Sequence, residues 1–277
     1  MATSIAVLDW LADPWTQAIG RRALIEVVLL GVVGGALGCW VVLYELAYSA
    51  ESLAHSLLPG LVGAALLGVP LLLGGAAGLL VGALAIALAR RVDRVGRDTA
   101  VAVVVTTLFG SGVLLAQSAS APAGLQDLLF GDVLGVSDAD LALAAGLVAL
   151  VLPALGLLHP RLLVVGFDRA GARSLGVRAF AVDSALLMLL AGALLVAVQG
   201  LGNLLVVAVL IAPASGARLL ARRMGPMIGL SAALAVFAGL GGMYLSYHAG
   251  TAAGASIALA LVASYGAAAC VRALRPA

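Results

Sequence analysis

Apolar runs long enough to cross a lipid bilayer follow one another through almost the whole chain, and this limits the available folds more than any other feature. A helix needs about 20 predominantly apolar residues to span the hydrocarbon core. Of the 277 residues, 64% are apolar and 10% are charged, whereas soluble domains contain about 25% charged residues. The runs lack the alternating polar face of a barrel strand. The sequence therefore predicts an all-α, polytopic membrane protein.

The runs predict about eight or nine transmembrane helices in a single membrane domain, residues 23–273. Residues 1–22 contain Trp10 and Trp15, and tryptophans are enriched at membrane–water interfaces, so this segment is expected to be interfacial. The second and third runs join without a polar loop and divide only near Gly68 and Pro70. The expected spans are 23–43, two within 53–89, 99–116, 140–158, 180–199, a short one at 203–213, 226–246 and 254–271.

The placement of arginine predicts which helix ends face the cytoplasm. Every basic residue is an arginine, and four connections hold most of them: 90–97, 159–178, 214–223 and the C-terminal tail. The loop at 117–140 has no basic residue and carries Asp127, Asp132, Asp138 and Asp140. Short basic loops stay in the cytoplasm, so loop 117–140 and the N-terminus are expected outside. Arg21 and Arg22 then also lie outside, against the rule.

The composition argues against several classes of chemistry. A P-loop uses a lysine to reach nucleotide phosphates, and the sequence contains no lysine. Cys39 and Cys270 lie in apolar runs without the spacing of a zinc site. We therefore expect a transport component rather than an enzyme, with no resident cofactor and no nucleic-acid partner. If ATP drives the protein, another chain hydrolyses it.

The segment ESLAHSLLPG, residues 51–60, contains the best candidate ligands. Glu51 and His55 are four residues apart, which places both side chains on one face of a helix. A carboxylate and an imidazole are good ligands for a first-row divalent ion, and ionisable groups within a membrane span are usually functional. The open alternative is a pair of polar residues that merely begins a helix.

A second segment, GNLLVVAVLIAPASGARLLARR at residues 202–223, predicts a docking element. Its apolar part is too short to cross the membrane before Pro213, and a basic helical turn follows. Such an element can present charge to a soluble cytoplasmic partner, although an ordinary proline-kinked helix end is the open alternative. The candidate docking residues are Pro213, Ala214, Ser215, Gly216, Ala217, Arg218, Arg222 and Arg223.

Several motifs, in order, resemble the permeases of the zinc/manganese family of ATP-binding-cassette importers. The segment A-E-S-L-A-H-S-L-L-P-G at residues 50–60 is similar to the family's G-D-A-L-S-H-A-x-L-P-G. Further similar segments are RDTAVAVVVTTLFGSGVLLAQ (97–117), LLFGDVLGVS (128–137), GFDRAGARSLGV (166–177), LLVVAVLIAPASGARLL (204–220) and SYHAGTAAGASI (246–257). The chain departs from the family where Glu51 replaces an aspartate, Tyr44 and Glu45 replace two arginines, and Ala249 and Gly250 stand at the late acid.

The resemblance implies a type II importer-like permease in the cell membrane, of prokaryotic origin. It implies a homodimer in membrane lipid, cytoplasmic ATPase subunits and an extracytoplasmic metal-binding protein. The transported substrate would be zinc or manganese, which would pass Glu51 and His55 by alternating access. The segment at 213–223 would be the coupling helix on which the ATPase docks.

Three alternatives remain at this level. A related permease for a siderophore or cobalamin would need a wide apolar path instead of a ligand pair. An ion-coupled secondary transporter would work without an ATPase. An intramembrane hydrolase would use Ser111, although FGSGV does not match the G-x-S-x-G pattern.

Overall fold

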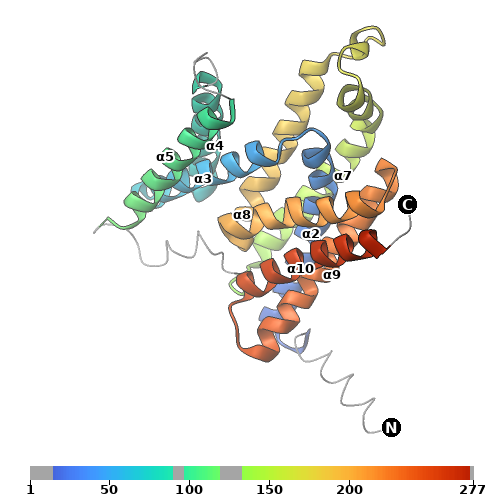
Figure 1. The fold of residues 1–277 in the computed structure, drawn as a ribbon. Coiled ribbons are helices and arrows are strands. Elements are labelled where there is room, and N and C mark those ends of the chain that lie inside the picture. Colours follow the sequence, from blue (N-terminus) through green and yellow to red (C-terminus); the bar gives the residue numbers. More distant parts are fainter. Residues whose placement is uncertain (1–14, 90–96, 119–132, 275–277) are drawn as a thin grey trace, which may run out of the picture.

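The computed structural model describes residues 15–89, 97–118 and 133–274, and every regular element in these ranges is helical (Figure 1). Eight α-helices and one short 3-10 helix account for these elements. They are α2 (Ala18–Leu43), α3 (Ala47–Leu67), α4 (Leu71–Ala89), α5 (Arg97–Ala116), α7 (Asp138–Phe167), η1 (Gly171–Arg173), α8 (Ala179–Leu220), α9 (Met224–Ala249) and α10 (Ala253–Leu274).

These helices confirm the predicted membrane-spanning architecture. Within the described ranges, six helical segments are long and apolar enough to cross a membrane, and three shorter apolar helices accompany them. Helix α7 is longer than the predicted span 140–158, because it continues through Pro153 and Pro160 to Phe167. Prolines are tolerated inside helices within a membrane, where neighbouring groups satisfy the freed backbone carbonyls. Most of the predicted interfacial segment 1–22 lies outside the described residues.

Helix α8 breaks where the sequence predicted a boundary, between the expected spans 180–199 and 203–213. Gly202 has φ 74° and ψ 163°, a conformation that is essentially restricted to glycine. The second half of α8 then continues through Pro213 to Leu220. The structure therefore confirms a short helix after the break, but this helix ends at Leu220 rather than at Pro213, and residues 213–220 are its last two turns. Figure 1 shows the yellow and orange halves of α8 running in different directions.

Helix α2 lies at the centre of the main helix group and packs against α7, α8 and α9. Its small residues let neighbouring backbones approach closely, which is the usual basis of helix association in membranes. A Cβ on Gly38 would overlap the carbonyl oxygen of Leu210 in α8. The Ser231 hydroxyl of α9 donates a hydrogen bond of 2.7 Å to the carbonyl of Gly35. These contacts hold both α8 and α9 against the glycine-rich middle of α2.

Helices α3, α4 and α5 form a second group beside this one (Figure 1). Helices α3 and α4 meet through glycines, since a Cβ on Gly60 would overlap the carbonyl oxygen of Gly74. Helix α4 follows α3 after Gly68, which adopts φ 68° at the C-terminus of α3. Helix α3 also contacts α8, and this contact places the candidate ligand pair between the two groups.

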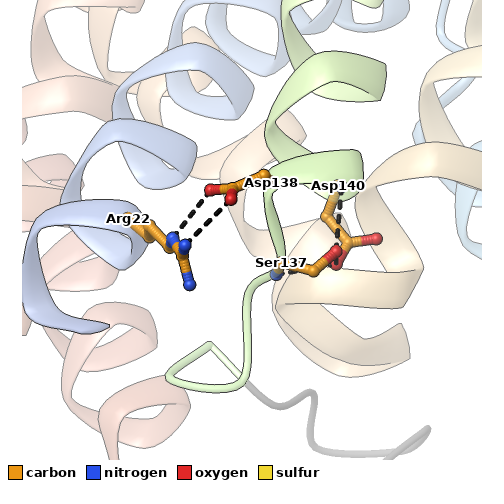
Figure 2. A network of polar contacts seen from close by, with 4 residues as sticks. All are labelled: Arg22, Ser137, Asp138 and Asp140. Atoms are coloured by element: carbon orange, nitrogen blue, oxygen red, sulfur yellow. Dashed lines mark hydrogen bonds and ion pairs between the residues drawn. The ribbon is translucent and has the colours of Figure 1, made fainter. Parts of the chain in front are cut away.

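An ion pair joins the starts of α2 and α7 (Figure 2). Arg22 Nε lies 2.8 Å from a carboxylate oxygen of Asp138, and Ser137 and Asp140 form a capping box at the start of α7. The start of α7 is therefore on the same side as the start of α2. Asp138 gives Arg22 a counter-charge on this side.

The opposite ends of the helices meet at the side that the arginine distribution assigns to the cytoplasm. The Tyr44 hydroxyl, just after α2, donates a 2.8 Å hydrogen bond to the carbonyl of Leu162 in α7. Burial raises the pKa of Tyr44 to about 12, and the Asp183 carboxylate adds to this effect. The phenol therefore stays a donor at physiological pH. Asp183, at the start of α8, is paired with Arg169 of the connection before η1.

Candidate functional site

Glu51 and His55 lie on one face of α3, as their spacing predicted. His55 Nε2 is 3.9 Å from Glu51 Oε1, and the side chains are 13% and 46% exposed for His55 and Glu51, respectively. The imidazole also packs edge-on against the Phe109 ring of α5, with 4.8 Å between ring centroids. Helix α5 therefore restrains the histidine, while the carboxylate is freer to move. The pair therefore offers one metal ligand that is held in place and one that can adjust its position.

Both side chains line a cavity of about 480 Å³ between α3, the second half of α8 and α10. Most of the wall is apolar, and two hydroxyl-bearing residues, Ser215 and Tyr265, complete it. The full lining is Glu51, His55, Val207, Ala208, Ile211, Ala212, Ser215, Val262 and Tyr265. A low-polarity wall strengthens the attraction between a carboxylate and a cation. The cavity is therefore suited to a small cation held by few ligands.

The distance within the pair permits a shared metal ion. Donors at about 2.1 Å from a first-row ion can be separated by up to about 4.2 Å, and the observed 3.9 Å lies within this limit. Among the described residues no group of three His, Cys, Asp or Glu side chains gathers to hold a metal. One chain thus offers an incomplete coordination shell.

The predicted docking residues divide into buried and exposed sets. The buried set is Pro213, Ala214, Gly216 and Ala217, which lie in the packing of α8. Ser215 is partly buried and lines the Glu51–His55 cavity instead. Only the side chains of Arg218, Arg222 and Arg223 are exposed. The docking prediction therefore rests on the arginines at the turn between α8 and α9.

Three further polar residues of the helices do not line this cavity. The Ser111 hydroxyl donates to the carbonyl of Leu108, so its proton is held by the backbone of α5 and the geometry gives no support to a nucleophilic role. Asp183 pairs with Arg169. Glu26 is 2% exposed and its carboxylate lies against the backbone of Gly200, where α8 approaches its break.

Sequence reasoning missed Phe109 and Tyr265, and it read Ser215 as part of a docking surface. These residues come from α5, α10 and α8, which are far from Glu51 along the chain. No local pattern marks an aromatic or hydroxyl residue in an apolar helix as a cavity residue. A signal was present only for the pair on α3, because a single helical turn brings both members together.

Comparisons with known proteins identify the family. Residues 17–272 match the profile of the ABC 3 transport family. The chain is 31% identical over 239 residues to the manganese import system permease protein ScaB of Streptococcus gordonii, with 86% of each chain covered. It is 30% identical to an iron transport system membrane protein of Haemophilus influenzae, over 91% of this chain and 93% of the relative.

The fold agrees with these relationships. A chain of PsaBC from Streptococcus pneumoniae, solved in complex with a Fab, superposes with a TM-score of 0.87 and 27% identity over 95% of each chain. The relatives are transport components of bacterial membranes rather than enzymes, and this removes the hydrolase alternative. The family, the helical membrane fold and the multi-pass location together confirm the reading of the motifs. The chain belongs to the ABC 3 transport family, as a membrane permease subunit of an ABC importer.

Proposed function

We propose that this permease moves a divalent metal ion, manganese or zinc, past Glu51 and His55. The observation that supports the proposal most is the pairing of a carboxylate and an imidazole at 3.9 Å on the wall of a mostly apolar cavity. Few other groups in such a cavity can replace the water that an entering cation gives up. The manganese permease among the relatives is consistent with this substrate.

The donor types alone do not separate manganese from zinc. One oxygen and one nitrogen ligand bind first-row ions in the general Irving–Williams order, so selection depends on the rest of the shell and on metal supply. The iron transport relative belongs to the same chemical range. We propose manganese as the first metal to test, because a manganese import permease is among the relatives.

A second copy of the chain would complete the site. One chain supplies two strong side-chain ligands, and the cavity is bordered by Val262 and Tyr265 of α10, which are 58% and 42% exposed. A homodimer that covers this face of α10 would bury both residues and bring a second Glu51–His55 pair toward the first. Two carboxylates and two imidazoles would then form a four-ligand path between the subunits.

Alternating access gives this site a direction. An extracytoplasmic metal-binding protein would deliver the ion to the outer face, and ATP binding to cytoplasmic ATPase subunits would change which side is open. Nucleotide can drive this change only because it binds one conformation better than the other. The break in α8 at Gly202 supplies a bend at which the cavity wall, formed by the second half of α8, can move relative to the first half.

The ATPase is proposed to dock on two exposed elements at the cytoplasmic side. One is the turn between α8 and α9, with Arg222 and Arg223. The other is the connection around η1, where Arg173 and Ser174 are exposed. This connection links α7 to α8 and is tied to α8 by the Arg169–Asp183 ion pair. A force on η1 would therefore reach the helix that carries the cavity wall.

The test is metal accumulation in cells that produce the chain with its ATPase and binding protein, measured by mass spectrometry. We expect His55→Ala to lower manganese uptake by roughly 10–100-fold, as loss of a metal-site group does elsewhere. His248→Ala is the matched control, because it removes a histidine from the end of α9, outside the cavity. Membrane levels of each variant are compared by immunoblot.

Equal accumulation by wild type and His55→Ala, at equal membrane levels, would overturn the metal path through α3. Uptake of a large iron chelate that survives this substitution would favour the chelate permease instead. Loss of zinc uptake with retained manganese uptake would keep the site and change the substrate.

A further inference from the structure

A second cavity, of about 780 Å³, lies at the predicted cytoplasmic ends of α2, α8 and α10. Three arginines line it: Arg218 near the end of α8, Arg222 in the turn to α9, and Arg272 near the end of α10. The other lining residues are Val42, Ser215, Leu219, Leu220, Ala221 and Tyr265. The wall of this arginine-lined cavity therefore carries three positive charges and no aspartate or glutamate.

No carboxylate in the described part of the chain neutralises these three guanidinium groups. Arg218 Nη1 donates a 3.2 Å hydrogen bond to the carbonyl of Val42, which fixes the group in place but leaves its net charge. The ion pairs among the described residues involve Arg22, His55 and Arg169 instead. Like charges that line a hollow with low-dielectric walls concentrate their field inside it, so the cavity has a strongly positive potential.

The arginine-lined cavity adjoins the Glu51–His55 cavity. Ser215 and Tyr265 contribute to the walls of both, so the two spaces share part of their lining. An ion that leaves Glu51 and His55 toward the cytoplasm would pass into the positive field. Charged side chains at a constriction act on permeating ions in this way, and arginine excludes cations.

We propose that Arg218, Arg222 and Arg272 form a cation-repelling vestibule at the cytoplasmic end of the transport path. The vestibule lowers the affinity of the inward-open Glu51–His55 site for divalent ions, because each bound cation must coexist with three nearby positive charges. Release into the cytoplasm becomes easier, and cytoplasmic ions rebind less. Small anions, by contrast, concentrate in the vestibule. The role in metal release rests on the proposed function, whereas the positive field does not.

The positive field of the vestibule can be measured without any metal. The full chain with Ser215→Cys and Cys270→Ser, in nanodiscs of zwitterionic lipid, is treated with anionic and cationic methanethiosulfonate reagents of similar size. Cys270 is removed because its thiol is exposed, while Cys39 is buried. We expect the anionic reagent to react faster, relative to a free thiol. Arg272→Gln should reduce this preference by about twofold or more at low salt.

Arg161→Gln is the control, because Arg161 is an exposed arginine on α7 outside both cavities. Tyr265→Cys provides a second reporter if Ser215→Cys does not accumulate in the membrane. Equal reaction rates for the two reagents at either reporter, or a preference that Arg272→Gln leaves unchanged, would overturn the positive vestibule.

The release role is tested on the assembled transporter in inside-out vesicles, where added Mn²⁺ reaches the cytoplasmic face. We expect metal transport by the Arg272→Gln variant to be inhibited at a severalfold lower Mn²⁺ concentration than transport by the wild-type protein. Unchanged inhibition, with a shifted thiol preference, would overturn the role in release and leave the vestibule's field intact. The proposed function has its own test in His55→Ala, so its failure is seen separately as unchanged metal uptake.

Discussion

Gly38 shows how single residues hold this membrane domain together. The residue is buried in α2, and a Cβ built on it would overlap the Leu210 carbonyl oxygen and lie 3.1 Å from the Ala214 Cβ. The obstacle is α8 backbone, which cannot rotate away as a flexible side chain can. Close helix contact through small residues supplies the van der Waals attraction that replaces the hydrophobic effect in lipid.

We therefore expect Gly38→Ala to destabilise the folded protein by about 1–3 kcal/mol, the usual effect of overpacking. The measurement is the thermal unfolding midpoint of the purified chain in detergent. Gly192→Ala is the matched control, because a Cβ on Gly192 in α8 meets no atom within 4 Å. Identical midpoints for Gly38→Ala and Gly192→Ala would show that α2 and α8 are not packed as closely as described.

The ligand pair shows what can be predicted at the residue scale. Glu51 and His55 share one helix, so their spacing alone predicts that they meet. Phe109 and Tyr265 join them only through the packing of α5 and α10. The local sequence of an apolar helix does not distinguish the aromatic and hydroxyl side chains that line a cavity from those that do not. Only the tertiary contacts determine which of them line it.

The element scale is clearest in α8. Proline is the usual indicator of a helix break, and the sequence therefore favoured Pro213. In the structure Pro213 is accommodated and the helix continues to Leu220, while the break lies at Gly202, between the predicted spans 180–199 and 203–213. The chain contains 35 glycines, and most of them in the described helices serve close packing or ordinary helical turns. Only the packing of α8 against its neighbours reveals which glycine adopts the unusual backbone conformation.

Gly202→Ala should destabilise the kinked form by about 1–3 kcal/mol, because φ 74° with ψ 163° strains any residue that has a Cβ. We also expect impaired transport, because the second half of α8 carries the cavity wall. The thermal midpoint and metal uptake are measured together, again beside Gly192→Ala. Wild-type stability and transport in Gly202→Ala would show that the bend is not required.

At the scale of the whole molecule, the ends of the helices sort onto two sides. Arg22 pairs with Asp138 at one side, and Trp15 Nε1 donates to the Tyr244 hydroxyl there. Tyr44 bonds Leu162 and Arg218 bonds Val42 at the other. The charge rule assigns this second side to the cytoplasm, because it holds most of the arginines among the described residues.

Thiol labelling in intact cells tests this orientation. In a Cys270→Ser background, Leu134→Cys should react with a membrane-impermeant maleimide, because Leu134 is exposed in the loop beside Asp138. Ser174→Cys, in the exposed connection after η1, should react only after the cells are opened. The reverse pattern would invert the assigned orientation and place the arginine-lined cavity at the outer face.

The sequence by itself determined that this chain is a helical membrane domain, where most of its helices lie, and which two residues on α3 form the candidate ligand pair. Each of these depends on composition or on spacing within one helix, so local order suffices. Tertiary structure decided that the last helix of α8 continues through Pro213 to Leu220, that four of the expected docking residues are buried, and that Ser215 and Tyr265 line two cavities. These features depend on which helix faces meet, and many faces of similar apolar helices are locally equivalent until packing selects one arrangement.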